Sequence, residues 1–146
     1  MKLIIACTPS GGIGYNGKLP WSKIEGDLPR FKELTSGKSV VMGRNTWESL
    51  PKKPLPNRTN YVLSSKFIDD AVTVFDIKLV PNDAWIIGGA RVIESCWDAI
   101  DEVHLSKTFT EYTCDTFIDL VKLEQEFLCW FKEQHTDHTY EIWKRK

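Results

Sequence analysis

The sequence predicts an α/β fold with a predominantly parallel central β-sheet flanked by helices, and with an antiparallel hairpin at the C-terminus. Short apolar runs such as residues 3–8 and 40–42 have the length and composition of buried strands. Polar turns containing glycine follow these runs and lead into helical segments, which is typical of strands that feed helices in an α/β sheet. Residues 127–143 alternate apolar and polar side chains around the polar stretch 135–138, which indicates two antiparallel strands.

Each element follows from local composition. Runs rich in β-branched and aromatic residues are expected to be strands, at 3–8, 40–42, 59–65, 71–75, the start of 85–97, 103–109 and twice within 127–143. Segments that open after a polar or glycine turn are expected to be helices, at 28–36 (ending at Gly37), 46–50 and the second half of 85–97. The glycine-rich stretch 9–20 and the proline-rich stretch 51–58 are expected to be loops.

Length and composition indicate a single domain spanning residues 1–146, large enough to bury a core without disulfides or metals. A net charge of −1 gives no reason to expect nucleic-acid binding or binding to an anionic membrane. The four cysteines form no metal-binding pattern, so we expect buried thiols in a reducing cytoplasm. The apolar run near the N-terminus is too short for the core of a signal peptide. We therefore expect a cytoplasmic protein, and a monomer, because no long apolar helical face is left over.

Three strand ends carry groups that suit an anion. Residues 43–46 and 88–91 each join a strand to a helix through glycine, and residues 64–66 add two hydroxyls and an ammonium. Each turn alone is equally explained as an ordinary tight or polar turn. Together they favour a ligand with several phosphates, and the basic residues Arg44 and Lys66 favour NADP over NAD.

Asp27 has two interpretations. It could be the N-cap of the following helix, accepting hydrogen bonds from the amides of Arg30 and Phe31. It could also be the one charged group in an apolar pocket, where it would hold a substrate. With Arg58 at the mouth of that pocket, the ligand would donate hydrogen bonds at one end and carry a carboxylate at the other. The histidines in 135–138 have no third ligand nearby, so we interpret them as a polar turn and expect no metal.

The order and spacing of seven motifs resemble the dihydrofolate reductase family across nearly the whole chain. These motifs are LPW (19–21), Asp27 with Phe31 and Lys32, VVMGRNTWESL (40–50), PLPNR (54–58), VLSS (62–65), IIGGARV (86–92) and DTF (115–117). The resemblance implies NADPH-dependent reduction of 7,8-dihydrofolate to 5,6,7,8-tetrahydrofolate, which supports one-carbon metabolism and thymidylate synthesis. Dihydrofolate and antifolate-type small molecules are the partners it implies.

The resemblance also implies roles for individual residues. Asp27 matches the acid that binds the pterin, and Trp21 and Ser106 match positions that share a water with it. The residues that match the substrate-binding wall and the carboxylate clamp are Ile5, Ala6, Leu28, Phe31, Lys32, Ser49, Leu50, Leu55, Arg58 and Ile87. Those that match cofactor contacts are Cys7, Ile13, Gly14, Leu19, Gly43, Arg44, Asn45, Thr46, Leu63, Ser64, Ser65, Lys66, Ile87, Gly88, Gly89, Ala90, Arg91 and Val92. Residues 9–23 match a mobile loop over the nicotinamide, and Gly88–Gly89 matches a pair joined by a cis peptide.

The chain departs from the family pattern at two places. Ile93 stands where the family usually has tyrosine, which removes a hydroxyl beside the nicotinamide. Residues 76–84 are too few for the helix usually found there, so the adenine side of the cofactor pocket is expected to be more open. Two alternatives remain: a reductase of the same fold acting on another pyrimidine or pterin, and a non-catalytic NADP-binding relative. Asp27 together with Arg58 argues against the first, and only Ile93 favours the second.

Overall fold

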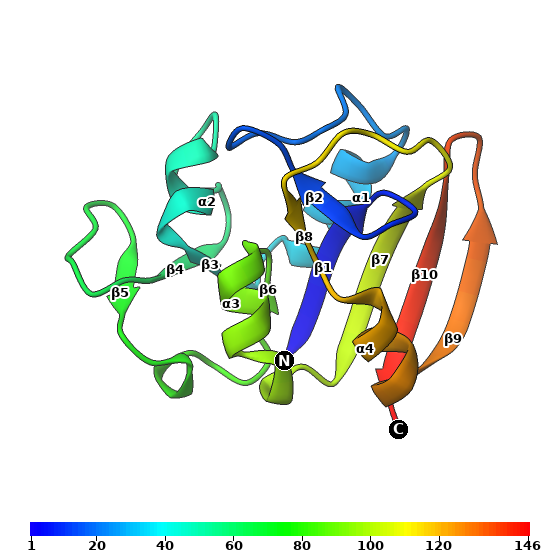
Figure 1. The fold of residues 1–146 in the computed structure, drawn as a ribbon. Helices are drawn as coiled ribbons and strands as arrows, with labels where there is room; N and C mark the ends of the chain where they lie inside the picture. Colours follow the sequence, from blue (N-terminus) through cyan, green and yellow to red (C-terminus); the bar gives the residue numbers. More distant parts are fainter.

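An eight-stranded sheet with the order β5-β4-β3-β6-β1-β7-β10-β9 forms the centre of the molecule (Figure 1). The computed structural model describes residues 1–146. The strands are β1 (Lys2–Cys7), β2 (Gly12–Gly14), β3 (Ser39–Gly43), β4 (Thr59–Leu63), β5 (Val72–Val74), β6 (Trp85–Ile86), β7 (Glu102–Thr108), β8 (Thr116–Phe117), β9 (Phe127–Gln134) and β10 (His138–Arg145). The helices are α1 (Asp27–Thr35), α2 (Arg44–Ser49), α3 (Ala90–Ser95) and α4 (Leu120–Glu126), with 3-10 turns η1 (Ile77–Leu79) and η2 (Trp97–Ala99).

The expected fold class is confirmed. The strands from β5 to β7 run parallel to their neighbours, with Leu3 opposite both Ile86 and Val103. The last two strands form the expected antiparallel hairpin, and β10 pairs antiparallel with β7, with Ile142 opposite His104. Parallel neighbours bring the carboxyl ends of their strands to one edge of the sheet, where ligands bind in α/β proteins.

Helices cover both faces of the sheet. Successive residues of β3 show the two layers, because Val40 and Met42 pack with Trp47 of α2, whereas Val41 lies in the larger core with Ile93 of α3. Leu34 of α1 packs against the smaller core, and Leu123 of α4 belongs to the larger one. Figure 1 accordingly shows α3 and α4 in front of the sheet and α1 behind it. None of the helices is long and apolar enough to cross a membrane.

The structure corrects several boundaries. The stretch 9–20 is not only loop, because β2 within it pairs antiparallel with β8, about a hundred residues later in the chain. Helix α2 begins at Arg44, two residues before its expected start. Helix α4 was not predicted, although its local signal is present, since the side chain of Asp119 accepts a hydrogen bond from the amide of Lys122 as an N-cap does. Residues 76–84 hold only the single turn η1.

The cysteines are only partly as expected. All four are free thiols, and Cys7 and Cys96 are buried. Cys114 is half-buried and Cys129 is exposed, so the expectation of four buried thiols is wrong. Cys129 lies on β9, which is the edge strand of the sheet and has no neighbour on its outer side.

Candidate active site

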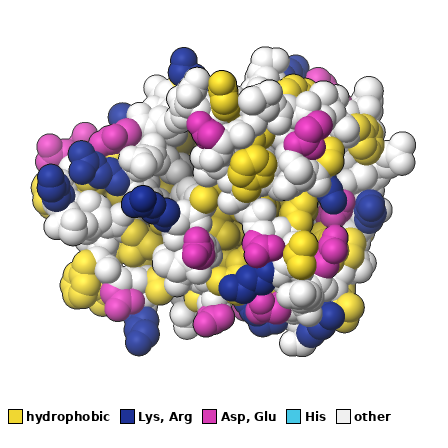
Figure 2. All heavy atoms as spheres, viewed as in Figure 1, with side chains coloured by type: hydrophobic (Ala, Val, Ile, Leu, Met, Phe, Trp, Pro, Cys, Tyr) yellow, Lys and Arg dark blue, Asp and Glu magenta, His cyan; other side chains and the backbone are white.

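The three strand ends that suit an anion are neighbours in space. They follow β4, β3 and β6, which lie side by side in the sheet order. The amide of Gly43 donates a 2.9 Å hydrogen bond to the carbonyl of Gly88 and joins two of these ends directly. Figure 2 shows a hollow between the regions of α2 and β2, with hydrophobic side chains in it and Lys and Arg side chains on the α2 side.

Glycines leave the room for a phosphate at this edge. A Cβ at Gly43 would lie 2.9 Å from Cγ2 of Val92, so only glycine fits between β3 and α3. The Gly88–Gly89 peptide bond is cis, and a Cβ on either glycine would fill the space beside Oγ1 of Thr46, at 3.5 and 3.4 Å. The Gly88–Gly89 backbone, which carries no Cβ atoms, and the neighbouring Thr46 hydroxyl form a cradle that suits the phosphates of a dinucleotide.

Polar side chains border this cradle. Nε of Arg44 lies 3.0 Å from Oε1 of Glu48, one turn later on α2, and both side chains are half exposed. Oγ of Ser64 accepts a 3.0 Å hydrogen bond from the amide of Lys66, which folds residues 64–66 back at the end of β4. Arg44 directly follows Gly43, which pairs with Leu63 of β4, so Arg44 begins its helix beside the end of β4, where the sequence predicts a phosphate contact.

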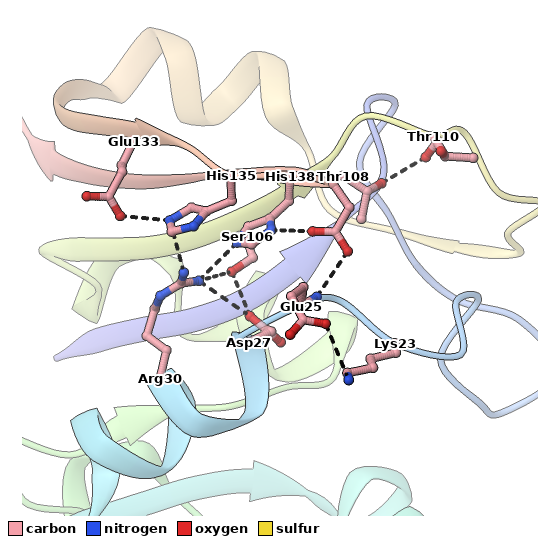
Figure 3. Close-up of polar contacts among 11 residues, drawn as sticks. Lys23, Glu25, Asp27, Arg30, Ser106, Thr108, Thr110, Glu133, His135 and His138 are labelled. Atoms are coloured by element: carbon pink, nitrogen blue, oxygen red, sulfur yellow. Dashed lines mark hydrogen bonds and ion pairs between the residues drawn. The ribbon is translucent and has the colours of Figure 1, made fainter.

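Asp27 is the first residue of α1 and does not cap it. The N-cap is Gly26, whose φ of 79° places it in the left-handed region, and the amide of Arg30 donates to the Gly26 carbonyl. The N-cap interpretation of Asp27 is therefore wrong, because glycine makes the turn and frees the carboxylate. Oδ1 of Asp27 accepts a 2.7 Å hydrogen bond from Oγ of Ser106 on β7. The two side chains lie close together in the close-up of Figure 3.

Aromatic residues flank Asp27 along the chain. Trp21 is buried and meets Tyr112 edge-on, with ring centroids 6.2 Å apart. Phe31 lies one turn after Asp27 on α1 and is half-buried. Leu28 is 73% exposed and Leu19 is 64% exposed, which makes them apolar groups open to a ligand.

Arg58 lies at the other end of α1. Its Nη1 donates a 3.0 Å hydrogen bond to Oγ1 of Thr35, and its Nε donates to the carbonyl of Pro56. The guanidinium lies 5.7 Å from the centroid of Phe31, and burial lowers the pKa of Arg58 from its ordinary value. Asp27 and Thr35 are separated by eight helical steps, or about 12 Å along the axis. A ligand that spans Asp27 and Arg58 must therefore be elongated.

The other predicted site residues surround these two groups. The predicted cofactor residues 43–46, 63–66 and 87–92 lie at the ends of β3, β4 and β6, while Cys7, Ile13, Gly14 and Leu19 lie at the end of β1 and in the loop after it. The predicted substrate residues lie on β1 (Ile5, Ala6), α1 (Leu28, Phe31, Lys32), the end of α2 (Ser49, Leu50), the following loop (Leu55, Arg58) and after β6 (Ile87). Ile93 is buried in the core and faces away from solvent.

Carboxylates anchor the loop that follows β1. The three anchoring contacts are Glu111 with Ser10, Asp115 with the amide of Asn16, and Asp137 with the amide of Glu25. A hydrogen bond from Ser10 lowers the pKa of Glu111, and amide hydrogen bonds from Asn16 and Glu25 lower the pKa values of Asp115 and Asp137. Backbone hydrogen bonds also join this loop to the segment around β8, because the amides of Asp115 and Ile118 donate to the carbonyls of Gly14 and Gly11.

Sequence reasoning missed one group in the site. Arg30 contacts Ser106, His135 in the turn between β9 and β10, and His138 at the start of β10, whereas the sequence indicates only a polar turn at 135–138 (Figure 3). The available signal was the spacing of Arg30 three residues after Asp27, which places them on one side of the helix. No pattern in the sequence connects α1 to the turn at 135–138.

Comparison with known proteins agrees with this geometry. Residues 1–144 match the family model described as dihydrofolate reductase. The chain is 34% identical over 163 residues to dihydrofolate reductase type 8 of Escherichia coli, an alignment that covers 100% of this chain and 96% of that protein. It is 38% identical over 131 residues to a bifunctional dihydrofolate reductase-thymidylate synthase of Paramecium tetraurelia, covering 81% of this chain and 28% of that longer protein.

A solved structure gives the same result. The dihydrofolate reductase of Enterococcus faecalis, complexed with NADP(H) and RAB-propyl, superposes with a TM-score of 0.85 and 27% sequence identity. The superposition covers 99% of this chain and 95% of that one. From its family match, its relatives and its fold, the chain belongs to the dihydrofolate reductase family.

Proposed function

We propose that the chain reduces 7,8-dihydrofolate to 5,6,7,8-tetrahydrofolate with NADPH, and so supports one-carbon metabolism and thymidylate synthesis. One observation carries this proposal. The carboxylate of Asp27, held by Ser106, lies at one end of α1, and the guanidinium of Arg58, held by Thr35, lies at the other. A pterin with a glutamate tail has complementary groups at its two ends, an amino-pyrimidine ring that donates hydrogen bonds and a carboxylate that accepts them.

The residues that would hold NADPH are those of the three strand ends. The backbone of Gly88–Gly89 and the hydroxyl of Thr46 suit the pyrophosphate, and Arg44 with Ser64 suits a 2′-phosphate. NADPH, when bound, supplies the hydride. Residues 76–84 hold only the 3-10 turn η1, which leaves fewer residues to cover the adenine.

Asp27 supplies the orientation of the substrate. The carboxylate accepts hydrogen bonds from the ring N–H and the 2-amino group, which fixes the pterin plane against α1. Negative charge on Asp27 favours a proton on the pterin, so the substrate becomes a better hydride acceptor. Trp21 and the loop 9–23 limit the access of water to this site, as the anchoring of that loop to β8 supports.

We also infer a single catalytic domain that acts as a cytoplasmic monomer and has no nucleic-acid or membrane partner. One continuous sheet takes strands from residue 2 to residue 145, which supports one domain. The free thiols and the net charge of −1 support the compartment and the absence of a polyanionic partner. A reductase of another pyrimidine would not need Arg58, whose pairing with Thr35 favours a carboxylated substrate.

The variant Asp27→Asn tests this function. The wild-type protein should consume NADPH only when dihydrofolate is present. Asp27→Asn should keep the fold and lose most turnover near neutral pH, and activity should recover on acidification as more substrate is protonated in solution. The control is Asp119→Asn, which changes the N-cap of α4 and should leave turnover unchanged. Wild-type turnover of Asp27→Asn at pH 7, or no folate-dependent consumption by the native protein, would contradict the proposal.

A further inference from the structure

Arg30 lies between Asp27 and the C-terminal hairpin. Its Nη1 is 3.1 Å from Oγ of Ser106 and 3.9 Å from Oδ1 of Asp27, and its side chain is only 16% exposed. The same Nη1 is 3.3 Å from Nε2 of His138. Figure 3 shows the guanidinium pointing from α1 toward the hairpin, with Ser106 between it and Asp27. A largely covered cation this close to the substrate-binding carboxylate of Asp27 requires a physical reason.

The chemistry of the donors sets the direction of the hydrogen bonds. A guanidinium can only donate, so Ser106 Oγ accepts from Arg30. The single proton of the hydroxyl is then directed to Oδ1 of Asp27, at 2.7 Å. A serine hydroxyl otherwise rotates toward any acceptor, so Arg30 selects the rotamer in which Ser106 holds Asp27.

The hairpin holds Arg30 in this position. Nδ1 of His138 lies 2.8 Å from Oδ1 of Asp137, and a proton on Nδ1 leaves Nε2 as an acceptor for Arg30. The guanidinium also lies 4.1 Å from the ring centroid of Tyr140, and burial raises the pKa of that phenol, which keeps the ring neutral. The contact with Tyr140 is therefore a cation–π interaction.

His135 also lies beside Arg30, but it does not accept a hydrogen bond from the guanidinium. Its Nε2 is 2.7 Å from Oε1 of Glu133 and 3.3 Å from Nη2 of Arg30. One ring nitrogen cannot donate to the carboxylate and accept from the guanidinium at once, and the shorter contact assigns its proton to Glu133. His135 stacks on His138, with centroids 4.7 Å apart, and covers the outer side of Arg30.

We propose that Arg30 is a positioning residue for Asp27, a role that rests on the proposed function. Through Ser106 it fixes Oδ1, and it leaves Oδ2, which has no hydrogen bond or ion pair within the protein, to the substrate. The titratable and charged groups around the pair are His138 and Tyr140 on β10, His104 behind Tyr140, Glu133 on β9, and His135 and Asp137 in the turn.

The test compares Arg30→Met with Arg30→Lys, and measures kcat and KM for dihydrofolate and for NADPH from about pH 5 to pH 9. Arg30→Met removes the donor to Ser106, so on the neutral plateau kcat/KM for dihydrofolate should fall about tenfold, the scale of one lost charge-assisted hydrogen bond. Arg30→Lys should restore only part of the plateau value of kcat/KM, because it keeps a charged donor but loses the planar fork.

A double-mutant cycle isolates the path through Ser106. If Arg30 acts through that hydroxyl, Arg30→Met and Ser106→Ala together should cost no more on the plateau than the worse single change. The KM for NADPH should be unchanged throughout. Lys122→Met, which removes another cation placed over an aromatic ring but far from the site, should behave as wild type.

The outcomes separate the two proposals. An unchanged plateau kcat/KM in Arg30→Met, or strictly additive losses in the cycle, would overturn the role of Arg30 while leaving the reductase activity in place. If Arg30→Met does not fold, the variants Arg30→Lys and Ser106→Ala decide whether Arg30 positions Asp27. Equal plateau values for Arg30→Lys and wild type would then refute the positioning role. A native protein without folate-dependent NADPH oxidation would instead refute the proposed function.

Discussion

Arg58 offers a direct test of the substrate site, because the structure separates it from the reacting end of the pocket. The variant Arg58→Leu removes the guanidinium that Thr35 and Pro56 hold at the far end of α1. A guanidinium–carboxylate contact of this partly buried kind is worth about 1.5–3 kcal/mol, which corresponds to about a 10- to 150-fold loss of kcat/KM. The loss should appear in KM, since the tail of the substrate is bound equally in the ground state and in the transition state.

The assay is the steady-state oxidation of NADPH with two substrates, dihydrofolate and a dihydropterin that lacks the glutamate tail. Arg58→Leu should impair only the first. The matched control is Thr35→Val, which keeps the guanidinium but removes the hydroxyl that positions it, and which should raise KM only a few-fold. If Arg58→Leu slows kcat at unchanged KM, or impairs the tail-less substrate equally, Arg58 does not bind the carboxylate and the assignment of the pocket fails.

Two further predictions concern the cofactor and the loop. Arg44→Ala should raise the KM for NADPH about tenfold and leave that for NADH unchanged, because only NADPH carries a 2′-phosphate; equal losses for both would exclude this contact. The pKa of Asp115 is lowered mainly by the amide of Asn16, so this contact is present above the ordinary pKa of an aspartate and is lost as the pH falls through the lower value of the folded protein. The amide resonance of Asn16 should therefore titrate in acid, and Asp115→Asn should abolish that titration; an identical titration in the variant would show that another group is responsible.

The elements of the fold were largely predictable. Periodicity and turn residues located the parallel strands, the C-terminal hairpin and the glycine turn before α3, because these patterns depend on neighbours a few residues apart. The strands that could not be predicted are very short, and they pair with segments far away in the sequence. The two-residue strand β8 has too few residues for a pattern, and it exists only because β2 lies beside it.

The candidate site also depends on conformations and contacts that local sequence patterns do not reveal. Asp27 and Ser106 could be named from a family resemblance, but local reasoning from the sequence favoured an N-cap for Asp27 over a binding role. The left-handed conformation of Gly26 decided the matter, since it turns the chain without the aspartate side chain. The exposure of Cys129 likewise depends on β9 being the edge of the sheet, which its composition does not reveal.

The sequence by itself determined the α/β class, the order of the motifs and the groups that suit phosphates and a carboxylated substrate. Only the tertiary structure decided what each of those groups contacts. Arg30 meets His138 across 108 positions of sequence, and Ser106 meets Asp27 across 79. Such contacts depend on strand order and register, which follow from how the whole chain buries its apolar faces and not from the spacing of any motif.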